Sequence, residues 1–356
     1  MRNQAERDPD DRHRAARIDD AWIRFRARRA RRRGWTETVL GYTGYGRAAT
    51  DGQPGWIRVL ARVVLTREPS VLVSSRRRHA LNGPGVRGWR SFTSVPVAGA
   101  PVEVEIDGRT FTATTDRGGV LDTRLEVGLS PGWHTATLRA GASARTEADL
   151  RVVDPATRFA VVSDIDDTVM VTALPRPLLA AWHTFVANEH ARTPTPGMAV
   201  LYERLVAAHP GCPVFYLSTG PWNVAPTLTR FLSRNLYPAG PLLLTDWGPT
   251  PDRWFRSGRE HKQANLARLA EEFPEIDWLL VGDDGQHDEE IYGDFAGRFG
   301  DHLAAVAIRQ LTPGEAVLAG GRTRDGRAVP SDRWVYGPDG AALAGELRRL
   351  GLLPAA

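Results

Sequence analysis

The spacing of hydrophobic positions divides the chain into two regions of different period. In residues 36–154 apolar and polar side chains alternate, as at Val102, Val104 and Ile106, which are separated by glutamates. A period of two predicts strands with one buried face, and Asp107-Gly108 predicts a hairpin turn. Further strands are expected at 57–65, 109–115, 133–138 and, as a last strand or a linker, 140–150. Short strands at this spacing predict a β-sandwich of immunoglobulin-like or transthyretin-like kind.

From residue 158 onward, short apolar runs alternate with longer amphipathic stretches. The runs predict strands at 159–162, 214–217, 242–244, 278–281 and 303–308. The stretches predict helices at 178–190, 198–209, 225–236, 262–272 and 288–299. This alternation predicts an α/β domain, with a largely parallel sheet covered by helices on both faces. A loop and a closing helix at 341–350 follow.

The chain begins with an arginine-rich segment. Residues 1–33 contain 12 arginines and six acidic residues, and Ile18, Trp22 and Phe25 share one face of a predicted helix. Three interpretations stay open: attraction to anionic lipid, contact with nucleic acid, and packing of the helix on the chain's own domain. Of the two partners, nucleic acid is the less favoured.

Composition sets the outer bounds. A chain of 356 residues with 42% hydrophobic and 25% charged residues is globular and has room for two domains. We expect a helix at 1–35, the β-sandwich at 36–154, the α/β domain at 155–311 and the closing segment at 312–356. The single cysteine, Cys212, excludes an intramolecular disulfide. No apolar run suggests a signal peptide or membrane span, so we expect a cytoplasmic protein with at most peripheral membrane contact.

Candidate chemistry gathers where the predicted strands of the α/β domain end. Asp164-Ile165-Asp166-Asp167-Thr168 follows the first strand, Ser218 follows the second, and Asp283 follows the strand at 278–281. The carboxyl ends of parallel strands meet at one edge of a sheet, where ligands bind. Lys262, expected at the start of a helix, is the single lysine among 46 cationic residues. A compact ammonium retained against such a bias indicates a position that cannot use the broad guanidinium fork.

These residue types suit phosphoryl transfer through an aspartyl-phosphate. A carboxylate can attack phosphorus, a second carboxylate can move the protons, and a divalent cation with a lysine can neutralise the charge. A calcium loop is the alternative for the aspartates. An EF-hand counted from Asp164 requires Gly at its sixth position and Glu at its twelfth, where this chain has Val169 and Pro175, so that alternative fails.

The motif at Asp164 resembles that of haloacid-dehalogenase (HAD) superfamily phosphatases over residues 158–309. The resemblance implies a HAD-like Rossmannoid sheet, Asp164 as nucleophile, Asp166 as general acid and base, and Thr168 as support of the loop. It also implies a Mg²⁺ site made by Asp164, the backbone carbonyl of Asp166, and Asp283.

The same resemblance gives roles to three further residues. Ser218 is expected to donate to phosphoryl oxygens, and Lys262 to bridge nucleophile and phosphate. Asp288 is expected to orient Lys262 or a metal-bound water, with Asp284 as the less favoured candidate for that task.

A narrower resemblance covers nearly the whole chain. Gly41-Tyr42-Thr43-Gly44-Tyr45-Gly46, Arg90-Ser91-Phe92, Pro221-Trp222-Asn223 and the motif from Gly282 through Tyr292 resemble the actin-patch-protein type of phosphatidate phosphatase. That family implies Mg²⁺-dependent conversion of phosphatidate to diacylglycerol. The chain departs from the family pattern at Thr219-Gly220 and at Asp284, where serine is expected; neither change removes a catalytic group.

Two alternatives to phosphatidate hydrolysis remain at this point. The chain could be a HAD phosphatase for a soluble or protein-bound phosphate, or a lipid- or protein-binding module on an inactive HAD scaffold. The segments 169–213 and 220–261 leave room for only a thin cover over the site. An open site of this kind suits a headgroup that is still in a bilayer.

Overall fold

A computed structural model describes residues 25–67, 94–171, 193–245, 251–285, 287–318 and 332–355. Three parts of the sequence interpretation lie outside these residues: the helix expected at 178–190, most of the arginine-rich segment, and Arg90-Ser91-Phe92. Within the described part, residues 25–32 are helical. None of the described helices combines the length and apolar content needed to cross a bilayer.

Within residues 36–67 and 94–154, the first region contains strands and no helix. They are β1 (Thr36–Arg47), β2 (Trp56–Thr66), β3 (Val95–Pro96), β4 (Pro101–Ile106), β5 (Arg109–Thr114), β6 (Val120–Glu126), β7 (Gly132–Ala140) and β8 (Thr146–Val153). Hydrogen bonds join them in one sheet of order β3-β2-β1-β8-β7-β4-β5, with β6 also paired to β2. The side chain of Arg109 on β5 also donates to the backbone carbonyl of Glu126 on β6. The strands are thus joined in one sheet, and the β-sandwich stays a prediction.

Local sequence explains the hairpin between β4 and β5. The side chains of Val102, Val104 and Ile106 are buried while the intervening glutamates are exposed, as the alternation predicts. Asp107 and Gly108 both have positive φ, 49° and 68°, which is the backbone that a two-residue hairpin turn requires. The register pairs Ile106 directly with Arg109.

The second region contains a six-stranded sheet. Its strands are β9 (Phe159–Asp164), β12 (Val214–Pro221), β13 (Leu242–Thr245), β14 (Asp277–Asp283), β15 (Leu303–Arg309) and β16 (Trp334–Gly337), in the order β13-β12-β9-β14-β15-β16. Every pairing in it is parallel. A small antiparallel pair, β10 (Met170–Val171) with β11 (Thr193–Pro194), flanks it. The predicted α/β class with a parallel sheet is confirmed.

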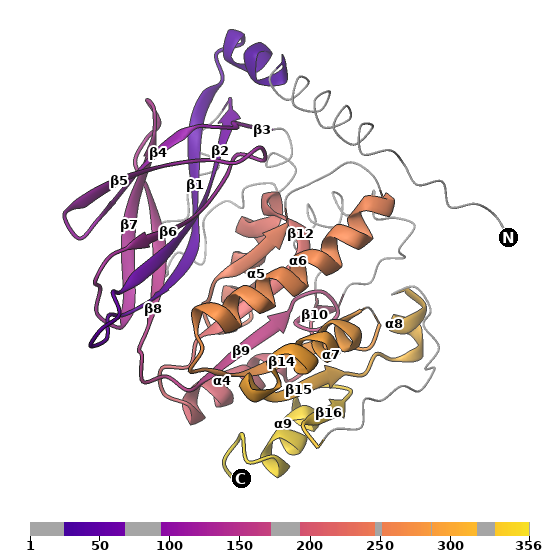
Figure 1. Ribbon diagram of the computed structural model, residues 1–356. Coiled ribbons are helices and arrows are strands. Elements are labelled where there is room, and N and C mark those ends of the chain that lie inside the picture. The colour runs from indigo at the N-terminus through magenta and orange to yellow at the C-terminus, as the bar shows by residue number, and fades with distance from the viewer. Residues whose placement is uncertain are drawn as a thin grey trace, which may run out of the picture.

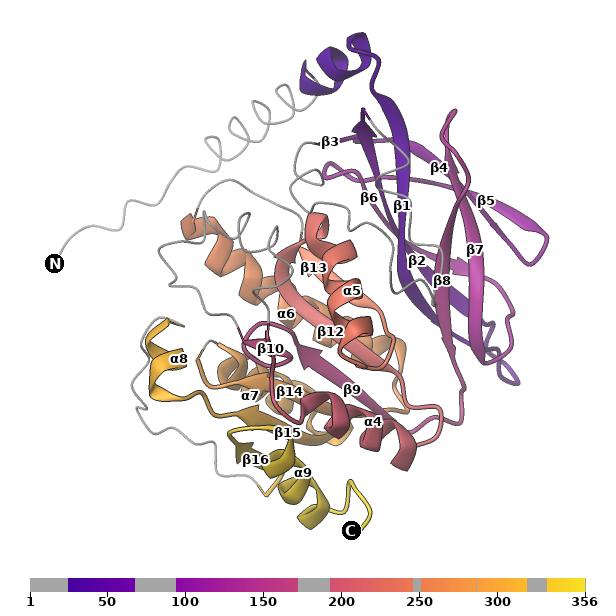
Figure 2. The same cartoon turned by 180° about the vertical axis from the view of Figure 1, so that it is seen from behind.

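Helices cover both faces of this sheet (Figures 1 and 2). One face carries α6 (Pro251–Glu272) and α7 (Asp288–Phe299), and the other carries α4 (Met198–Ala208), α5 (Ala225–Arg234) and α9 (Gly340–Arg349). The short helix α8 (Pro313–Leu318) follows β15.

Two features differ from the sequence interpretation. Lys262 does not begin a helix, because α6 starts at Pro251 and places Lys262 in its middle; proline favours such a first helical position. In the segment after residue 311, β16 extends the parallel sheet beside β15, so this segment contributes an edge strand as well as the closing helix.

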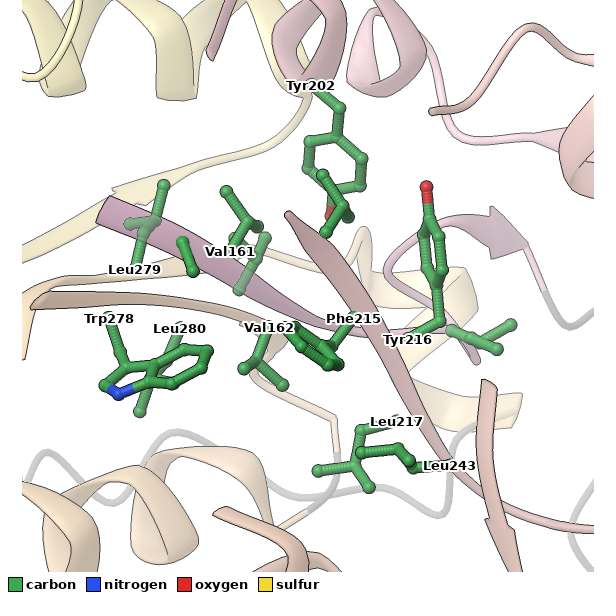
Figure 3. Close-up of a cluster of buried hydrophobic side chains, with 14 of the residues drawn as sticks. Val161, Val162, Tyr202, Phe215, Tyr216, Leu217, Leu243, Trp278, Leu279 and Leu280 are labelled. Atoms are coloured by element: carbon green, nitrogen blue, oxygen red, sulfur yellow. The ribbon is translucent and has the colours of Figure 1, made fainter. Parts of the chain in front are cut away.

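The core of the second region lies on both sides of the sheet (Figure 3). Successive residues of β9 point to opposite faces, so Val161 lies on the side of Tyr202 from α4 and Val162 on the side of Trp278 (Figure 3). All four side chains are essentially inaccessible to solvent. A sheet buried on both faces requires the continuous apolar runs seen in the sequence.

The two regions share a buried interface. Tyr42 of β1 stacks on Trp222, with ring centroids 4.7 Å apart, and Tyr45 donates its hydroxyl to Glu272 at 2.8 Å. Arg58 of β2 forms an ion pair with the same Glu272. Tyr42 and Tyr45 also belong to the hydrophobic core of the α/β region. The β strands therefore pack as part of one structure with the α/β region.

We predict that Glu272→Ala destabilises the protein by about 3 kcal/mol, because removing one partner of a buried ion pair leaves the other charge poorly compensated. Arg58 would retain Asp122, which places the effect at the lower end of that class. A thermal melt monitored by circular dichroism measures it.

The matched control is Glu105→Ala, which breaks the exposed pair with Arg145. We expect this control to lose less than about 1 kcal/mol. Equal melting of the two variants would contradict a stabilising role for the interface between the regions.

Candidate active site

The topology brings the candidate residues to one edge of the parallel sheet. Strand β9 lies in the middle, with β12 on one side and β14 on the other, and the chain returns from β13 to β14 through helix α6. Asp164, Ser218 and Asp283 lie at or near the carboxyl ends of β9, β12 and β14. Such a reversal of strand order opens the crevice in which α/β proteins bind ligands.

Lys262 joins two of the predicted acidic residues. Its Nζ lies 2.6 Å from Asp164 Oδ1 and 2.6 Å from Asp288 Oδ1, and all three side chains are almost fully buried. Burial alone would lower the pKa of Lys262, but the carboxylates of Asp164 and Asp288 outweigh it and raise the pKa above its usual value. The ammonium is therefore charged and fixed between the two carboxylates.

Asp288 is the first residue of α7 and connects Lys262 to β14. Its second oxygen accepts a long hydrogen bond from the backbone N–H of Asp283, at 3.4 Å. The space for this carboxylate exists because residue 282 is glycine: a Cβ there would lie 2.6 Å from Asp288 Oδ2 and 2.8 Å from the ring of Tyr292. The glycine at the start of the motif is thus a packing requirement.

Asp166 lies beside Ser218. The Ser218 hydroxyl donates to Asp166 Oδ2 at 3.0 Å and accepts from the backbone N–H of Gly220 at 2.9 Å. Asp166 is partly exposed, whereas Asp164 is 1% exposed. The second carboxylate of the motif is therefore more accessible to solvent than the first.

Negative charge exceeds positive charge at this edge of the sheet. Burial raises the pKa of Asp164 well above its usual range; Lys262 opposes this shift, and Asp288 adds to it. The pKa of Asp283 is likewise raised by burial and then by Asp288. One ammonium does not compensate three buried carboxylates, so the pocket favours additional positive charge.

The donor set fits a hard divalent cation. One carboxylate oxygen each from Asp164, Asp283 and Asp288 lies within 4.8 Å of the others. Among the described residues, Asp164 Oδ2 and Asp283 Oδ2 are buried without a hydrogen-bond partner. Buried carboxylate oxygens are rarely left without partners, and oxygen ligands are those that Mg²⁺ prefers.

Two residues of the motifs stand apart from this centre. Thr168 is completely buried, but its hydroxyl has no hydrogen-bond partner among the described residues, so its supporting role remains a prediction. Asp284 accepts from the backbone N–H of Leu311 at 2.8 Å, away from Lys262. The structure thus places Asp288, and not Asp284, beside the lysine.

Sequence reasoning missed two supports of the site. The buried Arg309 donates to the backbone carbonyl of Asp167 at 2.7 Å. Arg62 of β2 donates to the side chain of Asn223, which lies in the turn after Ser218. In a chain with 45 arginines, neither stood out by type, although the position of Arg309 at a strand end was a usable signal.

Comparison with known proteins agrees with the motifs. Residues 159–310 match the family model described as the catalytic domain of phosphatidate phosphatase APP1. These residues belong to the APP1 catalytic-domain family. The matched stretch begins at the first residue of β9 and ends one residue after β15, and it contains every predicted site residue.

Two yeast proteins are similar to parts of this chain. Phosphatidate phosphatase APP1 of Saccharomyces cerevisiae is 26% identical over 236 residues, which cover 62% of this chain and 39% of that protein. An uncharacterized protein of Schizosaccharomyces pombe is 24% identical over 155 residues, covering 43% of this chain and 25% of that protein. The matched part of the chain therefore spans well under half the length of each of these two proteins.

The solved structures that align with this chain are only weakly similar to it. A β-glucuronidase of Parabacteroides merdae aligns with 11% identity and a TM-score of 0.23, covering 77% of this chain and 34% of that one. At this TM-score the similarity identifies neither the fold nor the function.

We predict that Gly282→Ala displaces Asp288 and destabilises the protein by about 1–3 kcal/mol, the usual cost of adding a methyl group to a packed site. The neighbours of residue 282 are the Asp288 side chain and the Tyr292 ring, and both are completely buried. A thermal melt measures the loss.

The control is Gly297→Ala on the exposed side of α7, where an added Cβ meets nothing within 4 Å. We expect that variant to be neutral or more stable, since alanine favours a helix over glycine by about 1 kcal/mol. A Gly282→Ala protein as stable as the wild type would contradict the packing argument.

Proposed function

We propose that this chain is a Mg²⁺-dependent phosphomonoesterase of HAD type that removes the phosphate from phosphatidate to give diacylglycerol. The APP1 catalytic-domain match supports the reaction class, and the name of the S. cerevisiae relative, a phosphatidate phosphatase, supports the substrate. The central observation is the position of Lys262 Nζ, 2.6 Å from both Asp164 and Asp288. A parallel sheet whose central strand ends in the proposed nucleophile is compatible with the HAD assignment.

Asp164, Asp283 and the backbone carbonyl of Asp166 are the proposed holders of Mg²⁺, with Asp288 close enough to contribute. When bound, the cation would neutralise phosphoryl oxygens and so permit an anionic nucleophile to approach an anionic substrate. Lys262 adds a fixed positive charge at the same place and holds Asp164 in one orientation.

The first chemical step uses the two carboxylates of the motif. An oxygen of Asp164 forms a bond to phosphorus as the bond from phosphorus to the lipid oxygen breaks. Protonated Asp166 gives its proton to that departing oxygen, so diacylglycerol leaves as a neutral alcohol. Ser218, already beside Asp166, is placed to donate to a phosphoryl oxygen.

The second step regenerates Asp164. Asp166, now a carboxylate, takes a proton from water as the water oxygen bonds to phosphorus. The bond between phosphorus and Asp164 breaks, and inorganic phosphate is released. Dividing the reaction in this way replaces one slow displacement by two easier ones.

Membrane attraction is proposed for the arginine-rich N-terminal segment. In its described part, one face of the helix at residues 25–32 packs on the β region through the buried Ala27 and Ala30, while Phe25 is 59% exposed and Arg28 and Arg29 are exposed. An exposed aromatic residue beside several cations suits the surface of an anionic bilayer, where each cation contributes about 1 kcal/mol. A phosphatidate headgroup lies at such a surface.

Asp164→Asn should abolish phosphate release, and Asp166→Asn should reduce it by about 10²–10⁴-fold, the usual contribution of general acid–base catalysis. Removal of divalent metal with EDTA should stop turnover of the wild type, and Mg²⁺ should restore it. Release of inorganic phosphate from dioctanoyl phosphatidate is the measurement.

The matched control is Asp277→Asn, an exposed aspartate at the opposite end of β14, which should leave the rate unchanged. Turnover retained by Asp164→Asn would exclude the covalent route, and turnover in EDTA would exclude the metal requirement.

The substrate class is tested by comparing phosphatidate in phosphatidylcholine vesicles with soluble phosphomonoesters and a phosphopeptide. We expect the highest kcat/KM for phosphatidate in vesicles, since the N-terminal cations should concentrate the protein at an anionic surface. A higher value for a soluble or peptide phosphate would favour the alternative HAD phosphatase, and turnover of none would favour a binding module without enzymatic activity.

A further inference from the structure

Arg309 is a buried arginine at the carboxyl end of β15, the strand beside β14. It is 3% exposed and its guanidinium has three partners. Nη1 donates to the carbonyl of Asp167 at 2.7 Å, Nη2 pairs with Glu315 at 2.7 Å, and Nε donates to the carbonyl of Pro338 at 3.4 Å. A buried guanidinium destabilises a protein unless its N–H groups are hydrogen-bonded. These three partners therefore fix the orientation of the Arg309 side chain.

Glu315 is held in place independently of Arg309. Its carboxylate accepts from the backbone N–H of Thr312 at 2.9 Å, while the Thr312 hydroxyl accepts from the backbone N–H of Glu315 at 3.3 Å. This reciprocal pair is a capping box at the start of α8. The carboxylate that orients Arg309 is therefore fixed by local structure.

The carbonyl that Arg309 binds belongs to the turn that presents Asp166. Asp167, the next residue, has φ of 59°, a left-handed conformation that costs a residue other than glycine about 1 kcal/mol or more. Its N–H donates to the carbonyl of Met170 at 2.8 Å, which closes the turn. A charged hydrogen bond to the Asp167 carbonyl stabilises the turn in this one form.

We propose that Arg309 is a positioning residue for Asp166: by fixing the Asp167 peptide it holds the Asp166 carboxyl where the leaving oxygen receives its proton. The inference rests on the proposed function, in which Asp166 is the general acid. Arg309 itself lies behind the turn and takes no part in proton transfer.

A misplaced general acid has a characteristic kinetic signature. A poor leaving group such as the alkoxide of a phosphatidate needs a proton as it departs, whereas 4-nitrophenolate departs readily without one. The value of kcat/KM reports the steps up to departure of the leaving group, so later hydrolysis of the aspartyl-phosphate does not obscure it. Loss of positioning should therefore affect the two substrates unequally.

The experiment compares kcat/KM for dioctanoyl phosphatidate and 4-nitrophenyl phosphate in the full-length, Mg²⁺-loaded protein. For Arg309→Lys, which keeps the charge but loses the fork, we expect a loss of about tenfold or more on phosphatidate and under about threefold on the aryl ester, a fraction of the roughly 10²–10⁴-fold that an acid supplies. We call this unequal loss of kcat/KM on the two substrates a split. Glu315→Gln should show a weaker split in the same direction.

Arg333→Lys is the matched control, because Arg333 donates to the carbonyl of Leu303 at the opposite end of the same strand. It should leave both substrates unaffected. An equal loss on both substrates in Arg309→Lys, or no loss, would overturn the positioning role. If Arg309→Lys does not fold, the same criteria apply to Glu315→Gln.

Asp166→Asn separates this inference from the proposed function. It should show a larger split of the same sign as Arg309→Lys. A split in Asp166→Asn without one in Arg309→Lys would overturn the inference alone. The absence of a split in Asp166→Asn would refute the acid role of Asp166, and the inference would fall with it.

Discussion

The α/β region is organised around one buried charge, the ammonium of Lys262. A lysine with 3% exposure is stable only beside fixed carboxylates, and Asp164 and Asp288 supply them from β9 and the start of α7. To bring the ammonium there, α6 must lie close to the strand ends. A Cβ at position 258 of α6 would lie 2.9 Å from the Thr219 side chain, so glycine permits this approach.

The β region also contacts the segment that follows Ser218. Tyr42 stacks on Trp222 and Arg62 donates to Asn223, and both partners lie in the turn that follows Ser218. The short 3-10 helix Trp222–Val224, which follows the strand that carries Ser218, is therefore held by contacts from the β region. This arrangement gives a physical reason for the β strands to accompany the catalytic domain, whichever molecules the exposed face of the sheet contacts.

The sequence predicted the parts of the fold and of the site that depend on local patterns, but not those that depend on contacts between residues far apart in the chain. Asp164, Ser218 and Asp283 were found because strand ends in a parallel sheet converge by rule, and Lys262 because it is the one lysine. The edge strand β16 and the first half of α6 were not predicted, because neither a short strand nor the start of a glycine-containing helix has a distinct sequence pattern. The role of Arg309 depends on a backbone carbonyl 142 residues away, which no local pattern encodes.

The choice of lysine over arginine follows from the same geometry. An ammonium has three donors on one atom, and two of them are directed at Asp164 and Asp288 at 2.6 Å each. In the proposed mechanism, the third would donate to an oxygen of the phosphoryl group at Asp164. A guanidinium spreads its donors over a broad plane and would separate carboxylate oxygens that lie within 4.8 Å of one another. In a chain that otherwise uses arginine for every cation, the site retains the one side chain compact enough to leave the proposed nucleophile and the proposed Mg²⁺ ligands in contact.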